Sequence, residues 1–329
     1  MKNKQKICII LCMVLCCISL VHCGSKYTED DVEGSLLNKK SVYFITKSTE
    51  STFWKAVYAG ASAASTEYNM DLIFEGPSNE EDYMTQNEMI KHAIQEEADA
   101  IIISAVDYEK NARLIDEASK KNIKIVVIDS DVNSEHVKCR IGTDNYQAGC
   151  IAAQAALEQA EADHLNVGII NFDKITENGQ SREKGFREEI TKNQKVQIVD
   201  SVNIPSSVEE SKFITKKMLR EHPEMNVIVA FNEIVSVGAG QAVDELGVKD
   251  KTVVVAFDSH TSCIDFLETG VIDALVVQSP YAMGYLGVEN AHNIINGKEH
   301  TKDINTAAKL VTKENMYSEE NQRILFAFE

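Results

Sequence analysis

Short apolar runs alternate with longer amphipathic stretches from Ser41 onward. Runs such as Ile101–Ile103 and Ile125–Ile128 are apolar on both faces, which is typical of parallel strands covered by helices on each side. We expect strands at Val42–Thr46, Leu72–Glu75, Ala100–Ser104, Lys124–Asp129, Asn166–Asn171, Val196–Val202, Val227–Phe231, Val253–Asp258 and Ala274–Gln278. We expect helices at Phe53–Tyr68, Glu81–Glu96, Tyr108–Lys121, Asn145–Ala162, Ser181–Lys192, Glu209–Glu221, Ile234–Leu246 and Tyr281–Asn296. This alternation predicts an α/β fold with doubly wound parallel sheets.

The same pattern indicates two lobes. Each half opens with a strand, a polar loop and a long helix, at Val42–Ala64 and again at Asn166–Thr191. A chain with about nine strands divides more often into two sheets of four to six strands than into one large sheet. Two such lobes would direct the carboxyl ends of their strands toward a shared cleft, where doubly wound sheets bind ligands.

The first residues read as an export signal. Three lysines precede the nearly unbroken apolar run Ile7–Val21, which is short for a membrane-spanning helix and typical of a secretory signal peptide. The segment Leu20–Ser25 then resembles a bacterial lipobox, in which Cys23 would be acylated and become the new N-terminus. His22 departs from the small residue usual before that cysteine, and an uncleaved N-terminal anchor is the alternative. Both readings place the rest of the chain outside the cytoplasm.

Charge and cysteine content narrow the function further. The 329 residues carry a net charge of −18, and removal of the three lysines of the leader leaves about −21, which argues against a nucleic-acid-binding protein. Five of the eight cysteines lie in the first 23 residues. Cys139, Cys150 and Cys263 show no metal-ligand spacing, and we expect them to be small buried side chains, with a Cys139–Cys150 disulfide as the alternative.

Polar and aromatic residues gather just after the apolar runs. Carboxylates and amides accept or donate hydrogen bonds to sugar hydroxyls, and a charged partner strengthens each bond to about 1.5–3 kcal/mol. Flat rings pack on the CH-rich faces of a sugar, and Phe53, Trp54 and Phe231 are candidates for this contact. The strand ends therefore predict a binding site for a polyhydroxylated ligand.

Seven short motifs carry a family resemblance. They fall in the order and spacing of type I periplasmic sugar-binding proteins, which serve bacterial ABC importers, and the resemblance covers about residues 41–315. The motifs are Ser51-Thr52-Phe53-Trp54 with Gly60-Ala61, Ile128-Asp129, Thr143-Asp144-Asn145, Arg182-Glu183-Lys184-Gly185-Phe186, Asn232-Glu233, Ala256-Phe257-Asp258 and Gln278-Ser279-Pro280.

This resemblance implies a domain plan and a set of site residues. It implies two Rossmann-like lobes joined by a three-segment hinge. The first lobe would comprise 41–144 with 279–300, and the second 145–278 with 301–329. The signal peptide at 1–22 and a lipid-anchored linker at 23–40 would precede them. Phe53 and Trp54 would sandwich a monosaccharide. The other implied ligand contacts are Asp129, Arg182, Asn232, Asp258 and Gln278. Lys47 and Asp131 are further candidates.

Two departures bear on the ligand. Ribose-type members carry an arginine directly after the aspartate at Asp129, where this chain has Ser130, and an expected aromatic near Ile204 is missing. Both changes argue against ribose itself. Lys47 and the run Asp129-Ser130-Asp131 look more like relatives that bind autoinducer-2, although Phe231-Asn232 does not match those relatives.

Catalytic and cofactor motifs are missing from the sequence. It contains no HExxH, no nucleophile elbow and no P-loop, and Gly238-Ala239-Gly240 lies inside a helical pattern. We therefore expect no enzyme, metal or cofactor. The leading interpretation is a monomeric, lipid-anchored sugar-binding protein that delivers its ligand to an ABC permease by hinge closure. The alternative is a module that reports the sugar to a membrane histidine kinase or chemoreceptor.

Overall fold

The computed structural model describes residues 39–160, 162–172 and 174–326. The expected signal peptide and the lipobox with Cys23 lie outside these residues. Within the described ranges, no helix combines the length and apolar character that crossing a membrane requires.

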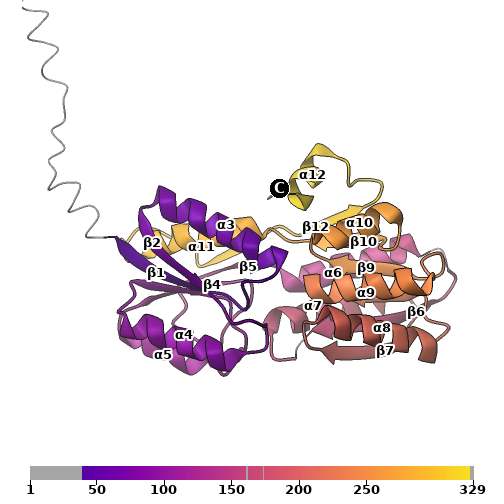
Figure 1. The fold of residues 1–329 in the computed structure, drawn as a ribbon, viewed down its shortest axis with the longest axis horizontal. Helices are drawn as coiled ribbons and strands as arrows, with labels where there is room; N and C mark the ends of the chain where they lie inside the picture. Colours follow the sequence, from indigo (N-terminus) through magenta and orange to yellow (C-terminus); the bar gives the residue numbers. More distant parts are fainter. Residues whose placement is uncertain (1–38, 161, 173, 327–329) are drawn as a thin grey trace, which may run out of the picture. The chain divides into compact units, whose positions relative to one another are not determined.

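Two six-stranded sheets organise the chain, as predicted (Figure 1). In spatial order, the first sheet holds β11 (Asp303–Thr306), β5 (Cys139–Thr143), β4 (Lys124–Ile128), β3 (Ala100–Ile103), β1 (Lys40–Ile45) and β2 (Met70–Glu75). The second holds β12 (Lys309–Thr312), β10 (Ala274–Val277), β9 (Val253–Phe257), β8 (Val227–Ala230), β6 (Leu165–Phe172) and β7 (Val196–Ile204). Strand pairs are parallel except β10–β12. The strand order also reverses within each sheet, so each sheet is doubly wound.

Helices cover both faces of the first sheet, and together they form the first lobe. α3 (Thr52–Glu67) and α11 (Pro280–Ile295) pack on one face, and α4 (Tyr83–Gln95) and α5 (Ala112–Lys120) pack on the other (Figure 1). Because side chains alternate along a strand, Val42 and Phe44 enter one core layer while Tyr43 and Ile45 enter the other. The two-faced apolar runs of the sequence have this origin.

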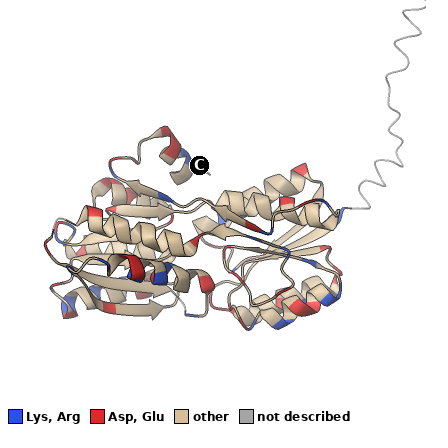
Figure 2. Cartoon of the chain, turned by 180° about the vertical axis from the view of Figure 1, so that it is seen from behind, with Lys and Arg blue, Asp and Glu red and all other residues tan. Residues whose placement is uncertain are grey.

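The second lobe is built in the same way around one continuous core. Its helices are α6 (Asn145–Gln159), α7 (Glu177–Ile190), α8 (Val208–Glu221), α9 (Glu233–Leu246), α10 (Thr261–Thr269) and α12 (Glu319–Leu325). Figure 2 shows acidic and basic residues interspersed along the helices, as on a solvent-facing surface.

The chain passes between the sheets three times, as predicted. The crossings lie between β5 and α6, between β10 and α11, and between β11 and β12. The expected assignment of 301–329 to the second lobe is wrong for β11, because Asp303–Thr306 pairs in parallel with β5 of the first sheet. The third crossing therefore lies after Thr306.

Glycines bring the helices that carry site residues into close contact. A Cβ added at Gly149 of α6 would lie 2.0 Å from the Arg182 carbonyl oxygen on α7. A Cβ added at Gly284 of α11 would lie 2.0 Å from the Val57 carbonyl oxygen on α3. Only glycine allows backbones to approach this closely. Both helix pairs thus hold in place the backbone next to the cleft.

Candidate functional site

The strand order of each sheet reverses at one strand. β1 lies between β2 and β3, and β6 lies between β7 and β8. Ligands of doubly wound sheets bind beyond the carboxyl ends of the strands at such a reversal. Lys47 follows β1 and Asp129 follows β4 in the first lobe, while Asn232 and Asp258 follow β8 and β9 in the second.

These residues meet at a small cavity of about 30 Å³. The seven expected ligand contacts and Lys47 all line it. Its full lining is Lys47, Ser51, Phe53, Trp54, Glu80, Asp129, Phe172, Asn178, Arg182, Asn232, Glu233, Ile234, Asp258 and Gln278. The structure therefore brings together, from both lobes, residues up to 231 positions apart in the chain, from Lys47 to Gln278.

Asp131 does not join this group. Its carboxylate accepts a hydrogen bond from Arg140 Nε at 2.9 Å and lines another cavity beside β5 and β11, which Asp129 also borders. Asp131 is not among the residues that line the cleft cavity, and it forms a partly exposed ion pair.

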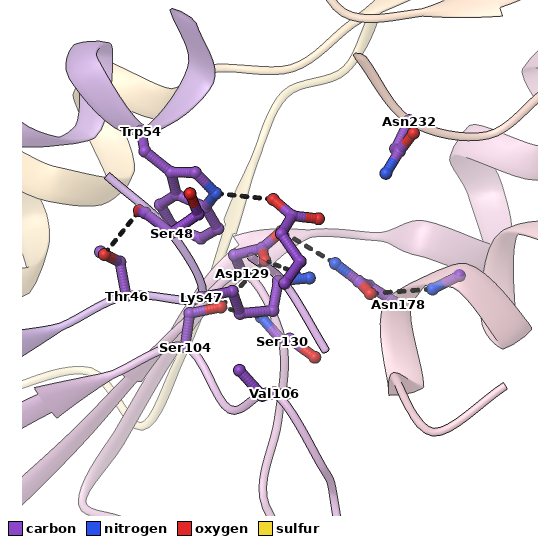
Figure 3. Close-up of polar contacts among 12 residues, drawn as sticks. Thr46, Lys47, Ser48, Trp54, Ser104, Val106, Asp129, Ser130, Asn178 and Asn232 are labelled. Carbon is purple, nitrogen blue, oxygen red and sulfur yellow. Dashed lines mark hydrogen bonds and ion pairs between the residues drawn. The ribbon is translucent and has the colours of Figure 1, made fainter. Parts of the chain in front are cut away.

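Asp129 is a fully partnered carboxylate at the end of β4. Its backbone adopts the left-handed conformation, with φ 56°. Its carboxylate lies 3.4 Å from Lys47 Nζ and accepts hydrogen bonds from Ser104 Oγ at 2.9 Å and from Asn178 Nδ2 at 3.0 Å. Asn178 belongs to α7 of the second lobe, so this contact joins the lobes (Figure 3).

Lys47 is held from two sides. Its side chain is 3% exposed, and its ammonium also lies 5.4 Å from the centre of the Phe172 ring. A buried lysine requires such compensation, since an unpaired ammonium in the interior is costly. The lysine and Asp129 therefore form one unit of the cleft wall.

Asp258 repeats the position of Asp129 in the second lobe. It follows β9 with φ 69°. Gln278 Nε2 donates to its Oδ1 at 2.8 Å. Burial raises the pKa of Asp258 to about 6, although the nearby Arg182 guanidinium and the hydrogen bond from Gln278 act in the opposite direction.

Arg182 organises the wall between these groups. Its guanidinium donates to Asn145 Oδ1 at 2.9 Å, to the Phe231 carbonyl oxygen at 2.7 Å and to Gln278 Oε1 at 2.7 Å. Gln278 Oε1 also accepts from Thr143 Oγ1 at 3.0 Å. Arg182 and Gln278 thus connect the first two crossings and fix the amide that holds Asp258.

The aromatic pair begins α3. Ser51 caps this helix by accepting from the Trp54 backbone N–H, and Trp54 Nε1 donates to Glu80 Oε1 at 2.7 Å. The rings of Phe53 and Trp54 lie 5.0 Å apart with an 82° angle between their planes. Two perpendicular neighbouring rings cannot sandwich a sugar between parallel faces, so in this arrangement the expected sandwich needs a ring from elsewhere.

Glu233 bridges the lobes from the start of α9. Its carboxylate accepts hydrogen bonds from the backbone N–H groups of Thr52 at 3.0 Å and Phe53 at 2.9 Å. Burial and the nearby carboxylates of Asp258 and Glu80 raise the pKa of Glu233 to about 8, although the two backbone N–H groups lower it. This buried acid therefore caps a helix of the opposite lobe.

Asn232 has two structural contacts beside the cavity. Its Oδ1 caps α9 by accepting from the Val235 N–H at 2.9 Å, and its Nδ2 donates to Ser206 Oγ at 2.9 Å. The Ser206 N–H donates to Glu81 Oε1 of the first lobe at 2.7 Å. Asn232 thus supports a further contact between the lobes.

Sequence reasoning missed several lining residues and misplaced one. Phe231 is fully buried between Phe186 and Phe257, so it belongs to the core, and the ring that lines the cavity is Phe172. Glu233 belongs to the motif Asn232-Glu233 of the family resemblance, so its position beside an expected ligand contact could have identified it. Glu80 follows β2 in an acidic loop and gave no signal.

The three cysteines of the described residues belong to the protein core. Cys139, Cys150 and Cys263 are free and buried, which confirms the expectation of small core side chains and contradicts a Cys139–Cys150 disulfide. Among the described residues, no cluster of three or more histidine, cysteine or acidic side chains is arranged to hold a metal ion.

A larger cavity of about 270 Å³ adjoins the site. Phe53, Glu233, Asp258 and Gln278 line both cavities and separate them. Apolar residues of α12, including Ile324 and Leu325, form part of its wall. Rearrangement of the shared wall would therefore enlarge the small cavity toward space that already exists.

Comparisons with known proteins agree with this architecture. Residues 42–299 match the family model described as periplasmic binding protein domain. A D-ribose/D-allose-binding protein of Pseudomonas aeruginosa is 24% identical over 91% of this chain and 97% of its own length. The ribose import binding protein of Bacillus subtilis is 24% identical over 79% of this chain and 83% of its own length.

Solved structures show the same fold. A carbohydrate transporter solute-binding protein from Agrobacterium radiobacter, in complex with D-arabinose, superposes with a TM-score of 0.85 and 29% identity, covering 88% of this chain and 99% of the other. An ABC transporter solute-binding protein from Agrobacterium vitis with bound D-fucose gives a TM-score of 0.84 and 27% identity, covering 87% and 99%. With its two doubly wound sheets, three crossings and a cleft at the strand ends, the chain belongs to the periplasmic binding protein family.

Proposed function

We propose that this protein is an extracytoplasmic solute-binding protein of an ABC importer and that it binds a monosaccharide between its lobes. The observation that carries the proposal is the cavity at the carboxyl ends of both sheets, lined by buried carboxylates, amides and aromatic rings. The sugar ligands of the relatives support it. The protein makes and breaks no bond in its ligand.

The lining suits sugar hydroxyls, each of which donates and accepts. Asp129 and Asp258 offer acceptors, Asn232 is an amide contact, and Arg182 and Gln278 supply donors or hold the acceptors in place. Phe53 or Trp54 supplies one ring for the sugar face. Phe172, from the opposite lobe, supplies the facing ring.

Binding couples to hinge closure. A cavity of about 30 Å³ has the volume of roughly one water molecule, whereas sites for small ligands occupy about 300 Å³ or more. Ligand entry therefore requires the contacts of Glu233 with α3 and of Asn178 with Asp129 to separate and rearrange. A ligand that contacts both lobes shifts the population toward the closed form in proportion to its differential affinity.

The N-terminal segment supports a location of the protein at the outer face of the cell membrane. Cys23 of the lipobox-like segment would carry the lipid, and the linker to residue 40 would tether a monomeric binding domain at the outer face of the membrane. Metabolic labelling with a palmitate analogue should mark the wild-type protein and leave Cys23→Ala unlabelled. Equal labelling of both would exclude Cys23 as the anchor.

A ligand screen tests the binding function. Thermal unfolding of residues 39–329 with pentoses and hexoses, including D-ribose, D-allose, D-arabinose and D-fucose, should show at least one sugar that stabilises the protein. A ligand at 100 times its Kd stabilises by about 2.7 kcal/mol, which is a shift of several degrees in Tm. Small-angle scattering of that complex should show a smaller radius of gyration. A full screen with no stabilising sugar would contradict the proposal.

One comparison favours the sensory alternative. A chain in a structure described as the XylFII-LytSN complex superposes with a TM-score of 0.77 and 26% identity over 84% of this chain. A chain of this fold is therefore found bound to a second protein component. Copurification of the tethered protein with a membrane kinase, in place of a permease, would select this alternative.

A further inference from the structure

The cavity has more acidic than basic groups. Glu80, Asp129, Glu233 and Asp258 line it on the acidic side, and Lys47 and Arg182 on the basic side. With every group ionised, the lining would carry two uncompensated negative charges. A neutral sugar would leave this imbalance in place.

Neither cation forms an ion pair with the second-lobe acids, although the Arg182 guanidinium lies near enough to lower the pKa of Asp258. The ammonium group of Lys47 forms an ion pair with Asp129. The three hydrogen bonds of Arg182 all go to uncharged oxygens, those of Asn145, Phe231 and Gln278. Among the described residues, no basic group lies within ion-pair distance of Asp258 or Glu233.

Asp258 also keeps an acceptor for a ligand. It is 5% exposed and lines the cavity, and the described residues give its carboxylate one hydrogen bond, from Gln278 Nε2 to Oδ1. Its Oδ2 receives none. A carboxylate oxygen without a protein donor is available to a ligand, and a donor that carries positive charge forms the strongest hydrogen bond with it.

We propose that the preferred ligand is a monosaccharide that carries a protonated amine, bound with its ammonium group against Asp258 and Glu233. This inference rests on the proposed sugar-binding function and names the class of sugar. The hydroxyls contact the remaining polar lining, and the ammonium supplies the charge that the second-lobe acids lack.

A proton balance follows from this arrangement. Burial, Asp258 and Glu80 raise the pKa of Glu233 to about 8, so at pH 6.5 its carboxyl is mostly protonated. The basic residues of the lining are Arg182, which donates to Gln278, and Lys47, which pairs with Asp129. An ammonium beside Glu233 favours the ionised form, so binding of a protonated amine releases up to about one proton. A neutral sugar has no such effect.

Calorimetry of residues 39–329 at pH 6.5 tests the proposal. D-Glucosamine, D-galactosamine and D-mannosamine are compared with D-glucose, D-galactose and D-mannose in two buffers of different ionisation enthalpy. We expect at least one amine to bind at least tenfold more tightly than its parent hexose. For that amine alone, the binding enthalpy should depend on the buffer in the direction of proton release.

Two variants add a matched comparison. Asp258→Asn should reduce the amine-to-parent affinity ratio at least tenfold, while Asp250→Asn, a change at an exposed aspartate that lines neither cavity, should keep it. If Asp258→Asn does not fold, the buffer dependence of the wild type decides. An unchanged ratio in a folded Asp258→Asn would overturn the proposal.

The wild-type results separate the two proposals. Neutral sugars that bind as tightly as their amines, or amines that bind without proton release, overturn the amine assignment and leave the sugar-binding function intact. No binding by any amine or by any sugar of the wider screen would overturn both.

Discussion

Asp129 and Asp258 hold corresponding places in the two lobes and differ in their electrostatic surroundings. Both follow the strand third from the same edge of their sheet, and both have a positive φ, 56° and 69°. Asp129 has Lys47 and two hydrogen-bond donors, whereas Asp258 has one amide donor. The repeated backbone thus fixes where a carboxylate enters the cleft, and neighbouring side chains decide whether its charge is compensated.

The largest effect should come from removing the cation of the first lobe. Lys47→Met leaves Asp129 buried without its ion-pair partner, which costs about 3–5 kcal/mol of unfolding free energy. Lys40→Met is the matched control, because the Lys40–Asp99 pair is 51% and 29% exposed and contributes about 0–1 kcal/mol. Urea denaturation measures both, and equal losses would show that Asp129 does not depend on Lys47.

The second lobe should instead show its imbalance as a pH dependence. Glu233 has a pKa of about 8 and Asp258 one of about 6, both raised by burial. A raised pKa stabilises the folded protein fully below the ordinary carboxyl pKa, and this stabilisation is lost as the pH rises through the folded value. Between pH 5 and 8.5 Glu233 alone should therefore lower the unfolding free energy by up to roughly 4 kcal/mol, and Asp258 should add a smaller loss at the acidic end of this range.

Glu233→Gln should flatten this dependence above pH 6, because the amide keeps an acceptor for the α3 backbone and has no proton to lose. Denaturation at a series of pH values measures the slope. A stability that rises with pH over this range, or a slope that the substitution leaves unchanged, would remove Glu233 as its source.

Matched substitutions compare the two aspartates directly. Asp129→Asn leaves Lys47 without its counter-charge and should cost about 2–3 kcal/mol at pH 7.5. Asp258→Asn removes a buried carboxylate that lacks an ion pair, so at the same pH it should leave the stability unchanged or raise it. Equal losses in the two variants would mean that the lobes compensate their carboxylates equally.

Among the cleft substitutions expected to lower stability, the smallest loss should come from the aromatic pair. Trp54→Phe removes the indole N–H that donates to Glu80, at a cost of about 1 kcal/mol. Burial is the largest cause of the raised pKa of Glu233 and Glu80 contributes less, so the pH dependence assigned to Glu233 should remain. A changed slope in this variant would show that the contact between Trp54 and Glu80 controls it.

The interior of the fold was predictable from sequence because its strands are buried on both faces. Ile101–Ile103 and Ile125–Ile128 can hardly be anything other than central parallel strands. The missed strands, β5, β11 and β12, lie toward one edge of each sheet, where short segments such as Cys139–Thr143 mix polar and apolar residues. The assignment of β11 to the wrong lobe has the same cause. Its pairing with β5 is a contact between segments far apart in the chain, and it leaves no pattern in the sequence of β11 itself.

The site was predictable in position more than in electrostatics. Strand ends located Asp129, Asn232 and Asp258, because the fold places every such residue at one edge. The charge state of Glu233 was not predictable, since it depends on backbone donors at Thr52, 181 residues away, and on burial between two lobes. The ring of Phe172 was missed because a phenylalanine at the end of an apolar strand reads as core.

The return of α11 and β11 to the first lobe sets the order in which the protein can be assembled. The apolar layer formed by Val42, Phe44 and Ile102 is covered by α11 residues such as Met283 and Val288, which emerge from the ribosome more than 200 residues after β1. The second sheet, apart from β12, is continuous in the chain. Domains ordinarily fold in the order of their synthesis. Here the first lobe receives α11 and β11 only after β6 to β10 of the second sheet have been made, so a nascent chain that stops before residue 280 lacks the α11 cover of this layer.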